Sequence, residues 1–332
     1  MWELSYVQAV AIGALQGVTE LFPVSSLGHS VLVPALIGGG WQHLVTESAT
    51  QESEASPYLA FIVALHVATA LALLVFYRRD WARLIGAFVR TLRTRRVQTS
   101  SERLAWLLVV ATIPVGVTGL ALEHLFRTLF AKPVAASAFL VVNGLILLGG
   151  ELLRRRAQTR SHPAPTPALS PGPVEAPGER GTGRPADGEP ATPSRPGAGL
   201  VIAQHRSLDN LAYREAAIIG LFQTLALLAG ISRSGITMVA GLLRGLDHED
   251  AAKFAFLLAT PVILAAGVLK LPGLAGPSGA HIHGQVLAGA LTAAVAAYAS
   301  VRFLSRWFTT RTLTPFAVYC LAMGLACLLR FA

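Results

Sequence analysis

Long apolar runs alternate with short polar segments along most of this 332-residue chain. A helix needs about twenty apolar residues to cross the hydrocarbon core of a bilayer. Runs near that length lie at 58–76, 104–122, 133–153, 254–271, 285–304 and 313–330. We therefore predict an all-α, polytopic membrane protein with about six transmembrane helices.

Two further apolar segments are each interrupted by a polar turn, and they match at an offset of 207 residues, which aligns Tyr6 with Tyr213. The same register aligns Gly13 with Gly220, Gln16 with Gln223, Ser25 with Ser232, and Ser26 with Arg233. Interrupted segments at corresponding places in two halves are typical of inverted repeats whose broken helices meet near the middle of the bilayer. We predict two re-entrant helical hairpins, related by an inverted-topology repeat, whose polar turns meet around a hydrated pocket.

Composition divides the chain into three parts. With 53% hydrophobic and only 14% charged residues, most of the chain is too apolar for an ordinary soluble domain. The exception is a tract with ten prolines between Pro163 and Pro196, which cannot bury enough apolar surface to fold. We predict a first membrane repeat over 1–156, a disordered cytoplasmic linker over 157–207 and a second membrane repeat over 208–332.

Positive charge is concentrated in the segments that flank the apolar runs. The formal net charge is +9, and eight arginines lie between residues 77 and 103. Multi-pass membrane proteins keep Lys and Arg in their cytoplasmic loops, so we expect 77–103, the linker and the segment around Arg306 on the cytoplasmic side. This arrangement accounts for the charge, and we exclude nucleic acid as a partner.

The first polar turn carries an ionisable residue within an apolar segment, which favours a functional site. Glu20 follows Gln16 by four residues, so both side chains lie on one helical face. Glu20 could act as a general base or a metal ligand, and either Ser26 or His29 as a nucleophile. Thr19 could support them with hydrogen bonds, and we expect Gln16, Thr19 and Ser25 to be substrate-binding residues.

The second polar turn places a permanent positive charge among hydroxyl groups. The guanidinium of Arg233 is a planar fork suited to two phosphate oxygens. Hydroxyls and amides at a helix start add donors that favour an anion; they come from Ser232, Ser234, Gly235 and Thr237. We predict that Arg233 is a phosphate clamp.

Three other polar features favour structural roles. His66 lies inside a span, where a hydrogen-bonded interior imidazole is the more frequent case. We expect Asn143 to make an interhelical hydrogen bond. The acidic cluster 247–250 resembles a metal site, but its position before a span favours helix capping and first-turn acids.

At the two turns the chain resembles the undecaprenyl-diphosphate phosphatase family, which is also known for bacitracin resistance. The resemblance covers essentially the whole chain outside 39–57 and the Pro-rich linker. One motif comprises Gln16 to Glu20 and Pro23 to His29, and the other runs from Gly230 to Gly235. Two positions depart from the family pattern. Gln16 stands where some members have a second glutamate, which weakens the case for a paired-carboxylate mechanism, and Ala229 stands where the family usually has proline.

The resemblance implies that Glu20, Ser26, His29 and Arg233 form a catalytic core, and that Ser25, Ser232, Ser234 and Thr237 assist phosphate binding. It implies an enzyme of the bacterial inner (plasma) membrane that hydrolyses undecaprenyl diphosphate on the extracytoplasmic side. The products would be inorganic phosphate and the monophosphate carrier lipid for cell-wall synthesis.

Several alternatives stay open at this point. Broken helices in inverted repeats are also a transporter architecture, so a polyprenyl-phosphate flippase is the alternative function, alone or together with hydrolysis. The family is associated with Mg²⁺ or Ca²⁺, which the sequence neither requires nor excludes because a diphosphate can bring the metal with it. The expected partners are the lipid substrate and membrane lipids, and the sequence leaves open whether the chain forms a homodimer.

Overall fold

A computed structural model describes residues 4–41, 57–121, 132–161, 208–270 and 282–332. Over these ranges every regular element is a helix. In chain order they are α1 (Tyr6–Thr19), α2 (Ser26–Ile37), α4 (Pro57–Phe76), α5 (Arg78–Thr94), α6 (Ser100–Ala121), α8 (Pro133–Ser161), η1 (Leu208–Asn210), α9 (Tyr213–Gln223), η2 (Thr224–Leu227), α10 (Arg233–Leu243), α11 (His248–Lys270), α12 (His283–Trp307) and α13 (Thr314–Phe331).

The predicted spans correspond to long apolar helices. Five of the described helices, α6, α8, α11, α12 and α13, are long and apolar enough to cross a membrane. A sixth candidate is the bent pair α4 and α5, in which the two helices meet at 87°. The prediction of an all-α polytopic membrane protein is therefore confirmed. Most of the predicted linker, 162–207, lies outside the described residues, and α8 continues to Ser161.

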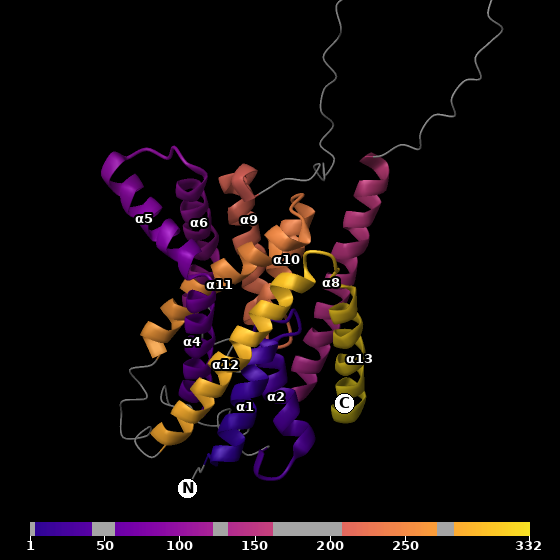
Figure 1. Cartoon of the computed structure of the whole chain (residues 1–332). Helices are drawn as coiled ribbons and strands as arrows, with labels where there is room; N and C mark the ends of the chain where they lie inside the picture. Colours follow the sequence, from indigo (N-terminus) through magenta and orange to yellow (C-terminus); the bar gives the residue numbers. More distant parts are fainter. Residues whose placement is uncertain (1–3, 42–56, 122–131, 162–207, 271–281) are drawn as a thin grey trace, which may run out of the picture.

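The bend between α4 and α5 follows from a change in composition. α4 carries no charged residue, whereas α5 opens with Arg78, Arg79 and Asp80 and contains three more arginines before it ends. Arginine is costly in the hydrocarbon core, so the chain turns away where the arginines begin. Figure 1 shows that the connection between α5 and α6 lies at the same end of the molecule as the arginine-bearing end of α8, opposite the N-terminus.

Each interrupted segment forms two short helices around an irregular turn. α1 and α2 flank the turn 20–25, while α9, η2 and α10 flank the turn 228–232. The starts of α1 and α9 are 207 residues apart, at Tyr6 and Tyr213, and so are the starts of α2 and α10, at Ser26 and Arg233. None of these helices exceeds 14 residues, which is too short to span a bilayer. Their relation as an inverted repeat stays a prediction.

Glycines allow both short leading helices to pack closely against long ones. Gly13 and Gly17 of α1 face the backbone of α12, where an added Cβ would collide with the carbonyl oxygens of Gly289 and Ala293. Gly220 of α9, which matches Gly13 in the 207-residue register, lies equally close to the carbonyl oxygen of Ala111 on α6. Small residues at such contacts let helix backbones approach each other in membranes.

A Gly220→Ala substitution should therefore destabilise the protein. Its new Cβ meets backbone atoms of α6 that cannot rotate aside, so we expect a loss of about 1–3 kcal/mol, as in other overpacked contacts. The measurement is the thermal unfolding midpoint in detergent. Gly149→Ala on α8 is the matched control, because its Cβ would have nothing within 4 Å and alanine favours a helix. Equal midpoints for the two variants would contradict this account.

Candidate active site

The first turn brings a carboxylate and a hydroxyl together. α1 ends where Glu20 forms its C-cap, and α2 begins at Ser26 after Ser25, whose φ of 71° lies in the left-handed region. Such a conformation is strained for a non-glycine residue, and here it reverses the chain so that Ser26 faces Glu20. The hydroxyl of Ser26 donates to Oε2 of Glu20 at 2.5 Å, and Nε2 of Gln16 donates to the same oxygen at 2.9 Å.

The second turn places a guanidinium at a helix start. Gly230 has φ 112°, a conformation open to glycine, and Ser232 caps α10 by accepting from the amide of Gly235 at 3.2 Å. Arg233 is the first residue of α10, and its Nη2 donates to Oε1 of Glu20. Two residues that lie 213 positions apart in the sequence thus join the two turns by a largely buried ion pair.

Backbone contacts hold the two turns in register. The hydroxyl of Ser25 accepts a hydrogen bond from the amide of Gly230 at 3.1 Å. From α8, Nδ2 of Asn143 donates to the carbonyl of Pro23 at 3.0 Å, and its Oδ1 accepts from the amide of Ser232 at 2.9 Å. Asn143 therefore bonds both turns at once. Its Nδ2 also donates to Sγ of Cys320 on α13 at 3.3 Å, which confirms the predicted interhelical hydrogen bond.

The two turns face a cavity of about 250 Å³. Its polar lining consists of Glu20, Ser25, Ser26, His66, Gln223, Ser232 and Arg233. Apolar residues from α2, α4, α6, η2 and α11 complete the walls, together with Ile231 of the second turn. A cavity with charged and hydroxyl groups on one part and aliphatic groups on the rest suits a molecule with an anionic head and an apolar chain.

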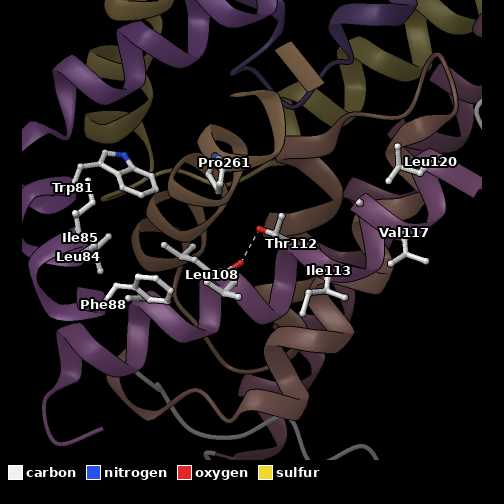
Figure 2. A pocket seen from close by; sticks show the side chains of 13 residues that line it. Trp81, Leu84, Ile85, Phe88, Leu108, Thr112, Ile113, Val117, Leu120 and Pro261 are labelled. Atoms are coloured by element: carbon white, nitrogen blue, oxygen red, sulfur yellow. Dashed lines mark hydrogen bonds between the residues drawn. The ribbon is translucent and has the colours of Figure 1, made fainter. Parts of the chain in front are cut away.

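A larger pocket of about 550 Å³ lies between α5, α6 and α11 (Figure 2). Its lining contains no charged residue or histidine. Thr112 lies on α6, and its hydroxyl donates to the carbonyl of Leu108 in the same helix at 2.8 Å. This pocket offers no group for acid, base or nucleophilic chemistry, so we assign the candidate site to the smaller cavity.

Comparison with known proteins shows the family to which the chain belongs. The family model described as "Bacitracin resistance protein BacA" matches residues 9–326. The chain belongs to this family. It is 66% identical to a Frankia alni protein named undecaprenyl-diphosphatase 2, with 100% of this chain and 99% of that protein covered. It is 56% identical to the undecaprenyl-diphosphatase of Mycolicibacterium paratuberculosis (99% and 98% covered) and 38% identical to undecaprenyl-diphosphatase 2 of Chromobacterium violaceum (98% and 99% covered).

Only some of the catalytic and phosphate-binding residues that the family resemblance implied line the cavity. Glu20, Ser25, Ser26, Ser232 and Arg233 line it. His29 is not among the lining residues. Its Nδ1 lies 2.7 Å from the carbonyl oxygen of Ser25 and its Nε2 lies 2.8 Å from the hydroxyl of Tyr319 on α13. Both ring nitrogens are therefore engaged in contacts that hold the first turn against α13.

The remaining predicted residues are not among those that line the cavity. Gln16 reaches it through its bond to Glu20. Thr19 donates to the carbonyl of Leu15 at 2.7 Å, and Ser234 donates to the carbonyl of Phe22 at 3.3 Å. Gly235 packs beside Pro23 and Leu147. Thr237 is buried, and its hydroxyl has no partner among the described residues.

Two residues that line the cavity, His66 and Gln223, were not predicted as site residues. His66 does contact its own helix, through Nδ1 and the carbonyl of Ile62 at 2.8 Å, but its Nε2 also lies 3.2 Å from Oε2 of Glu20. Gln223 was aligned with Gln16 by the repeat but not recognised as a site residue. The repeat itself was the signal that could have identified Gln223.

The acidic cluster before α11 has the predicted capping role. Asp247 accepts from the amide of Asp250 at 2.7 Å, and Glu249 and Asp250 lie in the first turn. His248 instead bonds Glu151 on α8, with 2.9 Å between its Nε2 and a carboxylate oxygen. Among the described residues no group of three or more His, Cys, Asp or Glu side chains is arranged to hold a metal ion.

Replacing Asn143 should weaken the contact between the two turns. In Asn143→Leu, the buried amide of Ser232 and carbonyl of Pro23 both lose a partner, and we expect a loss of about 1–3 kcal/mol in unfolding free energy. The thermal midpoint in detergent measures it. The control is Asn210→Leu, at an exposed position in η1. An unchanged midpoint in Asn143→Leu would show that the two turns are held by other contacts.

Proposed function

We propose that the chain is a membrane phosphatase that hydrolyses undecaprenyl diphosphate to undecaprenyl phosphate and inorganic phosphate. One observation carries the proposal: Glu20, Ser26 and Arg233, which the two turns bring together, line one cavity whose remaining walls are mostly apolar. This set supplies a base, a nucleophile and a phosphate-binding cation. The full-length relatives named undecaprenyl-diphosphatase support the same substrate.

Arg233 would bind the phosphate oxygens. A guanidinium has five N–H donors, and the contact with Glu20 involves only Nη2. The remaining N–H groups can donate to diphosphate oxygens without breaking that contact. Because Arg233 is the first residue of α10, the free amides and dipole of the helix start add to the attraction for an anion. The same groups would stabilise charge on the equatorial oxygens as the phosphoryl group transfers.

Ser26 would attack the terminal phosphorus. Its hydroxyl already donates to Glu20 at 2.5 Å, so the proton moves to the carboxylate as Oγ forms the new P–O bond. The bond from this phosphorus to the bridging oxygen breaks, and undecaprenyl phosphate leaves with the electron pair. Water then attacks the phosphoserine, with Glu20 passing the proton back to Oγ, and inorganic phosphate is released. His29 would position the turn rather than react, because its nitrogens contact Ser25 and Tyr319.

The residues present do not fit a divalent cation held by protein ligands alone. Glu20 is the only carboxylate among the residues that line the cavity. Its Oε1 accepts from Arg233, and its Oε2 from Gln16 and Ser26. Mg²⁺ and Ca²⁺ require several oxygen ligands. We therefore propose that any cation enters with the diphosphate, and no step above depends on it.

The membrane orientation is part of the proposal. The connection between α5 and α6 and the arginine-bearing end of α8 lie at one end of the molecule (Figure 1), and positive loops remain in the cytoplasm. The first turn belongs to the half of the chain that enters from the opposite end. We place hydrolysis on the extracytoplasmic side of the inner membrane, where the released monophosphate lipid could return to cell-wall synthesis.

Arg233→Lys should lower phosphate release by at least tenfold, because a point charge replaces a two-pronged donor. Tenfold corresponds to about 1.4 kcal/mol of transition-state stabilisation. The assay uses the full-length protein in detergent with undecaprenyl diphosphate, with and without a chelator. Arg214→Lys, at an exposed position on α9, should behave as wild type. Near-wild-type turnover of Arg233→Lys would contradict the role of Arg233 as a phosphate clamp. If the wild-type protein releases no phosphate, the result would favour a lipid carrier.

Ser26→Ala should reduce phosphate release by at least about a hundredfold, because it removes the attacking oxygen. His29→Ala should retain more activity than Ser26→Ala and should lower the unfolding midpoint, since it removes an anchor of the first turn. If His29→Ala abolishes release while Ser26→Ala retains it, the imidazole is the nucleophile and the assignment to serine is wrong.

A further inference from the structure

We infer that Gln223 is a substrate-binding residue whose side-chain amide donates a hydrogen bond to the diphosphate. The inference rests on the proposed function and extends its binding site from the two turns to the end of α9. The side-chain amide of Gln223 would be a neutral donor to the phosphates, in addition to the charged Arg233.

The environment of Gln223 favours a ligand contact. It is the last residue of α9, only 1% of it is exposed, and it lines the same cavity as Glu20 and Arg233. Neither Nε2 nor Oε1 of its side chain has a hydrogen-bond partner among the described residues. A buried amide without a partner is costly and rare in native proteins. An amide of this kind at the wall of a binding cavity is best explained by a ligand that bonds to it.

Gln16, the counterpart of Gln223 in the first half of the chain, has a hydrogen-bond partner for its side-chain N–H group. Gln16 occupies the equivalent position near the end of α1 in the 207-residue register, and its Nε2 donates to Glu20, four residues further along. The residue four positions after Gln223 is Leu227, which has no acceptor in its side chain. One glutamine is therefore committed to the catalytic carboxylate, whereas the amide of the other is available to the cavity.

The charge of the cavity explains why a neutral donor suits this position. A prenyl diphosphate carries at least two negative charges, while Arg233 is already paired with Glu20. An amide adds an N–H donor for a phosphate oxygen without forming another ion pair that would have to break before product release. A carboxylate at the same position would repel the diphosphate.

The test compares Gln223→Met, which keeps the size but removes the amide, with Gln223→Glu, which adds a charge. We expect Gln223→Met to raise KM for undecaprenyl diphosphate at least tenfold with less than a threefold change in kcat. We expect Gln223→Glu to raise KM further. A second readout is the thermal midpoint, which inorganic diphosphate should raise in wild type but raise less in both variants. Leu221→Met, at an exposed position of the same helix, is the control and should match wild type.

The outcomes separate this inference from the proposed function. If wild type releases phosphate and Gln223→Met keeps its KM within twofold, the inference is wrong and the phosphatase proposal stands. A lower unfolding midpoint without ligand in Gln223→Met would also overturn it, because the amide would then stabilise the fold. If wild type releases no phosphate but diphosphate still raises the midpoint through Gln223, binding is supported and hydrolysis is not.

Discussion

The structure depends on a buried charge and the donors that surround it. Glu20 is 7% exposed in a protein whose surroundings are largely hydrocarbon, where an unpaired carboxylate would be strongly disfavoured. Its Oε1 accepts from Arg233, and its Oε2 accepts from Gln16 and Ser26 and contacts His66. Removing one partner from such a buried pair usually costs several kcal/mol. The need to satisfy this carboxylate explains why two turns from distant parts of the chain meet.

Irregular backbone within the membrane must also be paired, and here the pairing is made between the turns. Ser25 bonds the amide of Gly230, and Asn143 bonds both Pro23 and Ser232. Broken helices at membrane depth are tolerated where protein supplies such partners. The polar groups that complete the fold are consequently neighbours of the groups that we propose for catalysis. Variants in this region need a stability measurement beside any activity measurement.

The sequence predicted the helices and the contact between the turns because both follow from simple constraints. Apolar runs of membrane length predicted the spans, and the matching Gln, Ser and Gly positions predicted the two interrupted segments. The 87° bend after Phe76 was not predicted, since an apolar run followed by arginines shows where a span ends but not at what angle. The role of His66 was also missed. Its contact with Glu20 depends on how α4 packs against α1, and no local pattern encodes that packing.

The role of His29 could not be decided from the sequence motif. It lies three residues after Ser26, and a motif alone cannot distinguish a reacting imidazole from one that holds the turn. The distinction comes from long-range packing, because Tyr319 on α13 occupies Nε2 of His29. The aromatic rings of the two residues are also stacked, with centroids 5.7 Å apart. Ser26 and His29 follow the carboxylate by six and nine residues, yet of the two only the serine hydroxyl bonds to it.

Gln16 adds a neutral hydrogen-bond donor beside Glu20 and avoids a second negative charge in the site. A glutamate there would place a second negative charge within hydrogen-bond distance of Glu20, and like charges so close in a low-dielectric site require a cation or a bound proton. The amide of Gln16 instead donates to Glu20 at 2.9 Å. Glu20 is thereby held as an acceptor for the proton of Ser26, and Arg233 offsets its charge. The site is thus balanced by a donor at position 16 rather than by a second acid.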